Sequence, residues 1–382
     1  MTNVFITGTG HTPFRKWQDT SIETLIAQAA QQAITDSGVD QKDITEIFIG
    51  HYGEGLIDQG FVASLVLNAF PQWRYLPITR VENACASGSA AVHQGCRAIA
   101  NGEHQHVLVL GAEHMSGSAN PGACLAKASY IAEESFPSFT HAFAHLTDAY
   151  FDRFSEQTLA LAKIAHKNHQ NGLRNDLAHL RKDFDLEFCL TESPKNPVVA
   201  GHLKRTDCSP ITDGAAAMVL SGAPKPGTEN AKISYWQHHN EFLPLSKRNP
   251  WQLEGCAHAW QQGLAKTQLS LDDFQLVETH DCFTIAELMQ YEAMGLTPIG
   301  EGSRALDEGW VYRDGKLPVN VSGGLKSKGH PIGATGVSMH VMAARQLTGT
   351  AGDMQLPSLN RAGVFNMGGT GAANYLSFIE AV

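Results

Sequence analysis

The 382-residue sequence lacks any long hydrophobic run. Its longest apolar stretches, such as residues 107–112, are far shorter than the ~20 residues that a helix needs to cross a bilayer. The start of the chain has no basic segment of the kind that precedes a secretion signal. No run of basic residues could follow a phosphate backbone, and the formal net charge is −10. We therefore expect neither a membrane protein nor a nucleic-acid-binding protein, and we expect a cytoplasmic location.

The sequence also lacks paired cysteines. Seven cysteines are scattered along the chain without a CxxC spacing, at Cys85, Cys96, Cys124, Cys189, Cys208, Cys256 and Cys282. Such an odd and scattered set predicts neither a disulfide framework nor a structural zinc site. What is present is an ordinary globular composition, 43% hydrophobic and 17% charged, which excludes wholesale disorder.

The patterning along the chain predicts the α/β class. Residues 107–110 form a continuous apolar run of the kind that is buried on both faces of a parallel sheet. Thr20 and Glu23 match a capping box, apolar residues follow them at helical spacing, and Gly38 is expected to end this helix. Small and apolar residues over 84–99 predict a further, buried helix.

The second half of the sequence repeats the order of elements of the first. A strand predicted at 44–50 leads to His51, and a strand predicted at 274–278 leads to His280. Further along each half, a short strand leads into a helix. These strands are predicted at 81–83 and 319–321, and the second helix at 331–347. The repeated order predicts two copies of one α/β unit.

We place the two copies at residues 1–230 and 231–382. Between about 117 and 204, aromatic, histidine and charged residues mix without strong strand signals. We therefore predict that the first copy carries an inserted, lid-like subdomain over this range.

One candidate site is the turn Asn83-Ala84-Cys85-Ala86-Ser87-Gly88-Ser89, which puts Cys85 at the start of a predicted helix. Unpaired backbone N–H groups and the helix dipole favour a thiolate there. The same N–H groups could hold an oxyanion formed when the sulfur attacks a carbonyl. The alternative is a buried cysteine that acts only as a small hydrophobic residue.

A second candidate is His330, which lies in a glycine-rich segment from Gly323 to Gly336 and is followed by Pro331. The proline suits a first helical turn, and the glycines allow a ligand or another backbone to come close. A histidine in this position could accept a thiol proton, although a lone histidine is more often structural. A third candidate, His280 with Cys282, follows a predicted strand, where open α/β sheets place their sites, but ligands for a metal are too few.

Together these segments resemble the thiolase superfamily. The resemblance rests on Asn-x-Cys-x-Ser-Gly at Cys85, on Gly-His-Pro-x-Gly-x-Thr-Gly at His330, and on the glycine-rich turn Asn366-Met367-Gly368-Gly369-Thr370-Gly371. Most thiolases have Asn-Glu-Ala-Phe where this chain has His280-Asp281-Cys282-Phe283, and a cysteine where it has Asn366. These two departures resemble the sterol-carrier-protein type of thiolase.

The resemblance implies the thiolase fold, in which two duplicated α/β halves form a five-layered αβαβα core. It implies cleavage of a 3-ketoacyl-CoA by coenzyme A, or the reverse Claisen condensation, through an acyl group on Cys85. His330 would be the base, Cys282 the acid and base at the substrate carbon, and His280 would hold a water at the enolate oxygen. The backbone N–H groups of Cys85 and Gly368 would form the oxyanion hole of the acyl-enzyme.

The resemblance also implies coenzyme A as co-substrate, with no other cofactor and no metal. Ser209 matches a position that touches the pantetheine arm. The phosphates could meet Lys163, Lys167, Lys204 or Arg205, or these residues could be solvated surface charges. Members of the family form homodimers, with tetramers in some branches.

Two alternatives remain open from the sequence. One is a thiolase-like aldolase that cleaves a 3-hydroxyacyl-CoA and needs a small partner protein. The other is a non-catalytic acyl-CoA-binding protein. Cys85, Cys282 and His330 together favour acyl transfer, because thiols have no role in a retro-aldol step.

Overall fold

The computed structural model describes residues 3–382. In this range a mixed sheet has the strand order β3-β2-β4-β7-β1-β8-β11-β10-β9. Its strands are β1 (Phe5–His11), β2 (Glu46–Gly50), β3 (Ile78–Val81), β4 (His106–Glu113), β7 (Gly214–Ser221), β8 (Ala231–Asn240), β9 (Leu276–Glu278), β10 (Arg361–Gly368) and β11 (Ala373–Ala381). The two halves of the sheet join between β1 and β8, where Phe5 pairs with Lys232 and Ile6 with Ala231.

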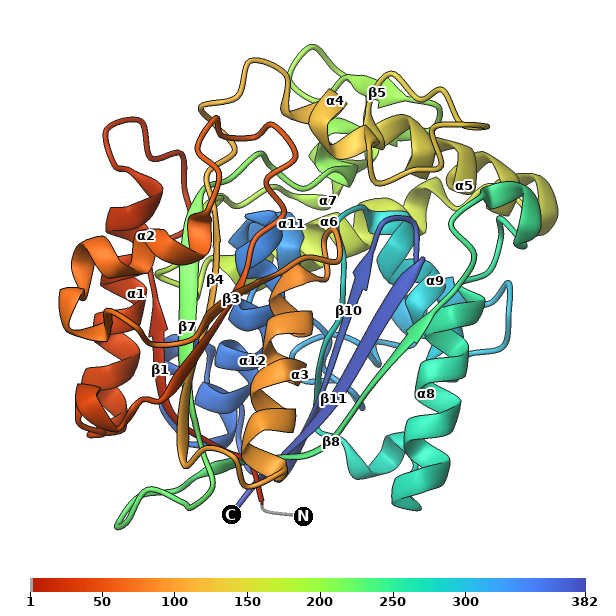
Figure 1. Ribbon diagram of the computed structural model, residues 1–382. Coiled ribbons are helices and arrows are strands. Elements are labelled where there is room, and N and C mark those ends of the chain that lie inside the picture. Colours follow the sequence, from red (N-terminus) through yellow and green to blue (C-terminus); the bar gives the residue numbers. More distant parts are fainter. Residues whose placement is uncertain (1–2) are drawn as a thin grey trace.

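Helices divide the molecule into five layers (Figure 1). The helices α1 (Ile22–Ser37) and α2 (Val62–Ala69) cover the outer side of the first half of the sheet. The helices α3 (Ser87–Ala100) and α12 (Ile332–Leu347) lie side by side between the two halves, and α8 (Glu254–Thr267) and α9 (Thr284–Ala293) lie outside the second half. This is the αβαβα arrangement that the family resemblance implied.

The two halves of the sheet have the same connectivity. In the first half, β2 runs parallel to β3 and β4, and β7 runs antiparallel to β4 and β1. In the second half, β9 runs parallel to β10, and β11 runs antiparallel to β10 and β8. The predicted duplication is therefore present. The predicted boundary at residue 230 falls in the connection between β7 and β8 and stays a prediction.

The expected strand at 319–321 does not form. Val319 makes only an isolated parallel bridge to Val277, at the edge position that β3 occupies in the first half. The chain turns away at Asn320, whose φ of 57° is incompatible with an extended strand. The side-chain oxygen of Asn320 accepts a hydrogen bond from the backbone N–H of Thr279 (2.8 Å), which holds this turn against the end of β9.

The first long helix begins one residue later than the capping box predicted. Ser21, not Thr20, is the N-cap of α1, and its hydroxyl accepts a hydrogen bond from the backbone N–H of Thr24 (3.3 Å). The other end agrees with the prediction, because Gly38 ends α1 in the left-handed conformation (φ 70°).

The two central helices touch backbone to backbone at their first turns. A Cβ atom added at Gly88 of α3 would lie 2.8 Å from the carbonyl oxygen of Gly333 and 2.8 Å from the nitrogen of Gly336, both in α12. A Cβ at Gly336 would overlap the backbone nitrogen of Ser89. The glycines therefore serve close packing of the two helices, which brings the residues before each helix together.

The segment predicted as an insertion lies above these helices, at the top of Figure 1. It contains α4 (Pro121–Ala126), α5 (Phe139–Phe154), α6 (Thr158–Gly172), α7 (Leu186–Leu190) and a separate two-stranded sheet of β5 (Val198–Ala200) and β6 (Leu203–Lys204). Two short helices, α10 (Gly302–Asp307) and α11 (Gly324–Lys328), lie in the second half.

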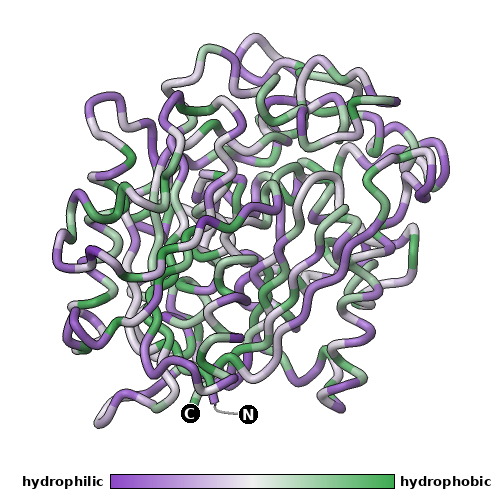
Figure 2. The backbone as a smooth tube through the Cα atoms, in the orientation of Figure 1, coloured by the Kyte–Doolittle hydropathy of each residue, from purple (hydrophilic) through white to green (hydrophobic). Residues whose placement is uncertain are grey.

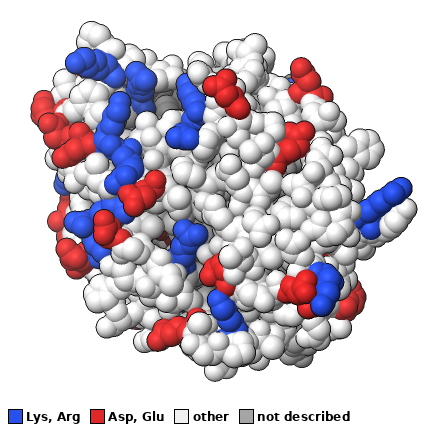
Figure 3. Space-filling model, turned by 90° about the vertical axis from the view of Figure 1, so that its left-hand side faces the viewer, with Lys and Arg blue, Asp and Glu red and all other residues white. Residues whose placement is uncertain are grey.

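Hydrophobic segments are concentrated in the strands and central helices, and hydrophilic segments follow the periphery (Figure 2). On the face in Figure 3, Lys and Arg side chains gather toward the upper left, whereas the middle carries few charges. Within residues 3–382, every helix is too short or too polar to cross a membrane.

Candidate active site

Cys85 lies in a strained turn between β3 and α3. Ala84 has a positive φ of 49°, and the Ser87 hydroxyl accepts from the backbone N–H of Asn83 (2.9 Å) and donates to the carbonyl of Ala84 (2.6 Å). The turn presents the sulfur to the backbone N–H groups of Gly369 and of Cys85 itself. Cys85 is 3% exposed, and its burial raises the pKa of the thiol to about 12 despite these two hydrogen bonds.

The resting state of Cys85 is therefore a neutral thiol, not the thiolate that the position before a helix predicted. Burial penalises the charged form more than the two N–H groups favour it, and Glu113 and Glu82 add repulsion.

His330 precedes α12 and has a defined tautomer. The Thr335 hydroxyl donates its single hydrogen to the carbonyl of Pro331 (2.9 Å), so it must accept from Nδ1–H of His330 (2.6 Å). The lone pair of His330 is consequently on Nε2, which is buried and has no hydrogen-bond partner among the described residues. Burial, with a smaller effect from Lys328, lowers the pKa of His330 to about 3, so the ring is neutral.

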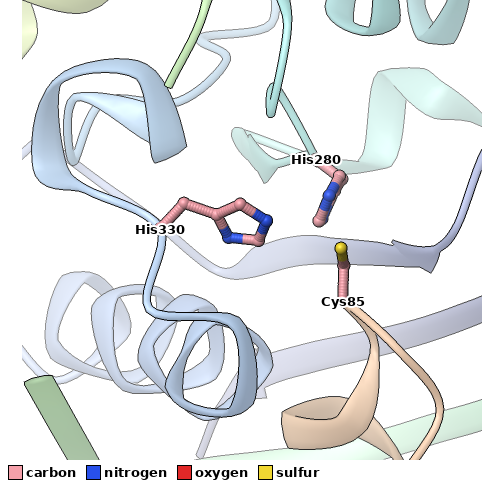
Figure 4. A group of neighbouring side chains, drawn as sticks. All are labelled: Cys85, His280 and His330. Carbon is pink, nitrogen blue, oxygen red and sulfur yellow. The ribbon is translucent and has the colours of Figure 1, made fainter. Parts of the chain in front are cut away.

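Three side chains meet at this point. The sulfur of Cys85 and one ring nitrogen each of His280 and His330 lie within 4.8 Å of one another. The two imidazole rings meet edge to face, with centroids 5.1 Å apart (Figure 4). The three atoms are also a possible ligand set for a thiophilic metal ion. The expectation that the protein holds no metal stays a prediction.

His280 is held by Asn366 of β10. The Asn366 nitrogen Nδ2 lies 2.8 Å from His280 Nδ1 and 3.2 Å from the carbonyl oxygen of Cys85. Burial, reinforced by His330, lowers the pKa of His280 well below its usual range, so His280 is neutral as well. Its Nε2 is buried without a hydrogen-bond partner within residues 3–382.

Cys282 lines the same pocket as Cys85 and is 2% exposed. Burial, and then Cys85 and Asp281, raise the pKa of Cys282 well above its usual value, so this thiol is also protonated. The carboxylate of Asp281 accepts from the backbone N–H groups of Leu325 (2.6 Å) and Lys326 (3.1 Å). Asp281 thereby ties the Cys282 loop to the segment that leads to His330.

The pocket at Cys85 is small and largely apolar. It has about 80 Å³ of free space and is lined by Cys85, Met115, Gly122, Leu125, Phe139, Thr140, Cys208, Ser209, Pro210, Ile211, Cys282, Phe283, His330 and Ile332. Residues from α4 and α5 form one wall, so the inserted segment closes the pocket. Phe283 stacks on Phe143 (4.6 Å between centroids), which makes this wall stiff.

A larger groove of about 830 Å³ begins where the pocket ends. Ser209 belongs to both cavities, and its backbone N–H donates to the carbonyl of Cys282 (3.0 Å). The sequence had marked Ser209 and Arg205 for coenzyme A, and both line this groove. Its other basic residues were missed: Lys16, Lys182, Lys195 and Lys326.

The three lysines considered for phosphate binding are engaged elsewhere. Lys167 is buried and pairs with Glu287 (2.8 Å), Lys204 is buried and pairs with Asp207 (3.4 Å), and Lys163 pairs with Asp307 (2.6 Å). Glu287 and Asp307 are distant in sequence from their lysines, and the burial of the Lys204–Asp207 pair is not visible in the sequence. The sequence alone therefore could not distinguish lysines with a structural role from lysines that bind a ligand.

Gly368 lies at the end of β10, where an added Cβ would overlap the carbonyl oxygen of Asn83. The backbone N–H that reaches the Cys85 sulfur belongs to the next residue, Gly369, whose φ is 61°. The expectation that the Gly368 backbone N–H helps to form the oxyanion hole of the acyl-enzyme stays a prediction.

Family comparisons agree with this geometry. The description "Thiolase, N-terminal domain" matches residues 4–223, and "Thiolase C-terminal domain-like" matches residues 238–380. The chain therefore belongs to the thiolase family, and it is an acyltransferase.

Among its relatives, an acetyl-CoA acetyltransferase of Methanothermobacter thermautotrophicus is 32% identical over 381 residues, with 97% of each chain covered. Sterol carrier protein 2 of Oryctolagus cuniculus is 29% identical and covers 97% of this chain and 70% of the relative.

Two solved structures have the same fold. An Ltp2-ChsH2(DUF35) aldolase has a TM-score of 0.82 at 19% identity, covering 100% of this chain and 98% of the other. Human mitochondrial 3-ketoacyl-CoA thiolase in complex with CoA has a TM-score of 0.74 at 18% identity, with the same coverage. At these identities the likeness concerns the fold alone.

Proposed function

We propose that the protein is a thiolase that cleaves 3-ketoacyl-CoA with coenzyme A, or catalyses the reverse condensation, through an acyl group on Cys85. The observation that carries this proposal is the approach of the Cys85 sulfur to within 4.8 Å of ring nitrogens of His280 and His330, beside Cys282 in one pocket. A nucleophile, a base and a second thiol are the groups that acyl transfer with carbon–carbon cleavage requires.

In the cleaving direction, His330 Nε2 takes the proton of Cys85 while the sulfur bonds to the C3 carbonyl carbon of the substrate. Because both groups are neutral at rest, the proton moves as the carbon–sulfur bond forms, when the developing charge on the carbonyl oxygen can be stabilised. The bond between C2 and C3 then breaks, and its electron pair stays with the acetyl-CoA fragment as an enolate.

Cys282 gives its proton to C2 of this fragment, which suits a thiol whose burial keeps it protonated. The proton of the incoming coenzyme A thiol replaces the one that Cys282 lost. The coenzyme A sulfur bonds to the acyl carbon, the bond to Cys85 breaks, and His330 returns its proton to the Cys85 sulfur. Backbone N–H groups of Cys85 and of the Gly368–Gly369 turn would hold the acyl oxygen.

Coenzyme A would lie in the groove of about 830 Å³, with its pantetheine arm passing Ser209 and its phosphates near Arg205, Lys182 and Lys195. The pocket beyond has about 80 Å³, less than three times the ~30 Å³ that one water molecule occupies in the liquid. This supports short acyl groups, so acetoacetyl-CoA is the first substrate to test.

Thiolysis of acetoacetyl-CoA by the wild type and by Cys85→Ala tests the proposal. We expect turnover by the wild type, an acetyl group on the Cys85 peptide by mass spectrometry, and loss of both in the variant. Binding of coenzyme A without turnover would contradict the proposal and support the non-catalytic alternative.

Because a solved aldolase has the same fold, aldolase activity is the alternative function that has to be excluded. A retro-aldol step on a 3-hydroxyacyl-CoA requires no thiol, so cleavage of such a substrate at equal rates by the wild type and Cys85→Ala would favour the aldolase. Two thiols and a neutral imidazole in one pocket favour acyl transfer.

We also expect a homodimer. The strand β3 pairs only with β2 in the described sheet, so one edge of β3 is open, whereas Val319 partly covers the corresponding edge at β9. An open edge strand is available for pairing with another chain. Sedimentation velocity of the wild type would show whether it is a dimer, a tetramer or a monomer.

A further inference from the structure

We propose that Asn366 is a positioning residue that fixes the His280 ring with its proton on Nε2, so that His280 donates a hydrogen bond directly to the substrate oxygen. This inference rests on the proposed function, in which that oxygen is the enolate oxygen of the acetyl-CoA fragment. It replaces the water that the family resemblance implied with the imidazole itself.

The first step is the orientation of the Asn366 amide. The amide atom that lies 2.8 Å from His280 Nδ1 lies also 3.2 Å from the carbonyl oxygen of Cys85. A carbonyl oxygen can only accept a hydrogen bond. The amide atom between the two groups must therefore be the NH₂ nitrogen, because the opposite orientation would set two oxygens against each other.

The second step is the tautomer of His280. Since Asn366 Nδ2 is a donor, His280 Nδ1 must accept from it, and a neutral imidazole that accepts at Nδ1 carries its proton on Nε2. Burial keeps His280 neutral, and its Nε2 is a buried polar atom without a partner in the part of the chain that is described. A buried N–H without a partner is costly and therefore points to a missing acceptor.

The third step is the complementarity of the two histidines. His330 presents a lone pair on Nε2 because Thr335 accepts from its Nδ1–H, whereas His280 presents an N–H. One ring can take the thiol proton of Cys85 while the other donates to the enolate oxygen of the acetyl-CoA fragment as the C2–C3 bond breaks. The same Asn366 amide holds the Cys85 carbonyl, so one side chain sets both the nucleophile turn and the donor.

The test compares two changes at this position. Asn366→Ala removes the donor, and Asn366→Asp replaces it by a carboxyl group that, when ionised, can only accept and so draws the His280 proton to Nδ1. We expect kcat for acetoacetyl-CoA thiolysis to fall about 10-fold or more in the first variant and further in the second, with the KM for coenzyme A little changed, since loss of an oxyanion-hole donor costs about 10²–10³-fold in kcat.

A double-mutant cycle separates positioning from a structural role. If Asn366 acts through His280, Asn366→Ala has no further effect on kcat in a His280→Ala background. The matched control is Asn230→Ala in the connection between β7 and β8, where Asn230 is also buried and donates to the carbonyl of Thr228 (2.9 Å), outside the site. Its kcat should stay near the wild-type value.

Nitrogen-15 spectra of protein with labelled histidines give a readout that does not depend on activity. The signal assigned to His280 by its loss in His280→Ala should show the Nε2–H tautomer in the wild type and lose it in Asn366→Asp. An Nδ1–H tautomer in the wild type, or additive effects in the double variant, would overturn the inference. Absence of thiolysis in a wild type with the Nε2–H tautomer would overturn the proposed function and leave the assignment of the proton intact.

Discussion

Alkylation of Cys85 by iodoacetamide should increase steeply with pH, because the structure makes this cysteine a neutral thiol. Burial raises the pKa of Cys85 from 9.0 to about 12. That rise disfavours ionisation by about 4 kcal/mol and leaves a thiolate fraction of roughly 10⁻⁵ at pH 7. Since only the thiolate reacts, the rate constant should rise about tenfold for each pH unit between pH 6 and 9.

The measurement is the rate of carbamidomethylation of the Cys85 peptide, resolved from other cysteines by mass spectrometry, in protein free of coenzyme A. A short cysteine peptide gives the reference rate at each pH. Limited access to the pocket slows the reaction equally at every pH, so the slope is the informative quantity. A rate that is constant between pH 6 and 8, or faster than the reference at pH 7, would show a thiolate and refute the reasoning.

Four further outcomes are expected. Thr335→Val leaves Nδ1–H of His330 unpaired, so the free energy of unfolding should fall by about 1–3 kcal/mol and kcat should fall as well, while Thr335→Ser keeps near-normal kcat. Combined Lys182→Ala and Arg205→Ala should raise the KM for coenzyme A and leave kcat nearly unchanged, as initial rates will show. Burial holds the pKa of His340 at about 4, below 6.5, so the free energy of unfolding should fall as pH decreases below 6.5. Between pH 7 and pH 5, the free energy of unfolding of His340→Asn should therefore decrease by about 2 kcal/mol less than that of the wild type, as measured by denaturant titration. Gly336→Ala should lower the melting temperature and kcat together, because the new Cβ overlaps Ser89 and separates α3 from α12, and wild-type kcat in this variant would contradict the packing argument.

Much of the fold could be predicted from the sequence, because local patterns specify it. Residues 107–110 read as a strand buried on both faces, and they lie in β4 between β2 and β7. Gly38 ends α1 as expected. The errors occurred where neighbouring residues have similar propensities: Ser21 caps α1 rather than Thr20, and Asn320 bends the chain where Val319 and Val321 suggested a strand.

The position of the candidate site could be predicted from the sequence, but the protonation states of its residues could not. Motifs placed Cys85, His280, Cys282 and His330 at one site. In the structure Cys85, Cys282 and His330 line one pocket, and a ring nitrogen of His280 lies within 4.8 Å of Cys85 and His330. The sequence predicted a thiolate from the helix start alone, because the extent of burial around a sulfur depends on segments far apart in the chain. The same limitation hid the role of Asn366, whose partners are 86 and 281 positions away.

The duplicated fold explains why the nucleophile and the base face each other. Cys85 precedes α3 of the first half, and His330 precedes α12, the equivalent helix of the second half. Because these two helices pack backbone to backbone at Gly88 and Gly336, the residues before them converge on one point. Farther along, the Ser377 hydroxyl of β11 lies 3.0 Å from His93 Nε2 of α3 and 2.9 Å from His340 Nε2 of α12. The distance between sulfur and imidazole is thus set by the core that joins the two halves, and the inserted segment contributes a wall of the pocket rather than its chemistry.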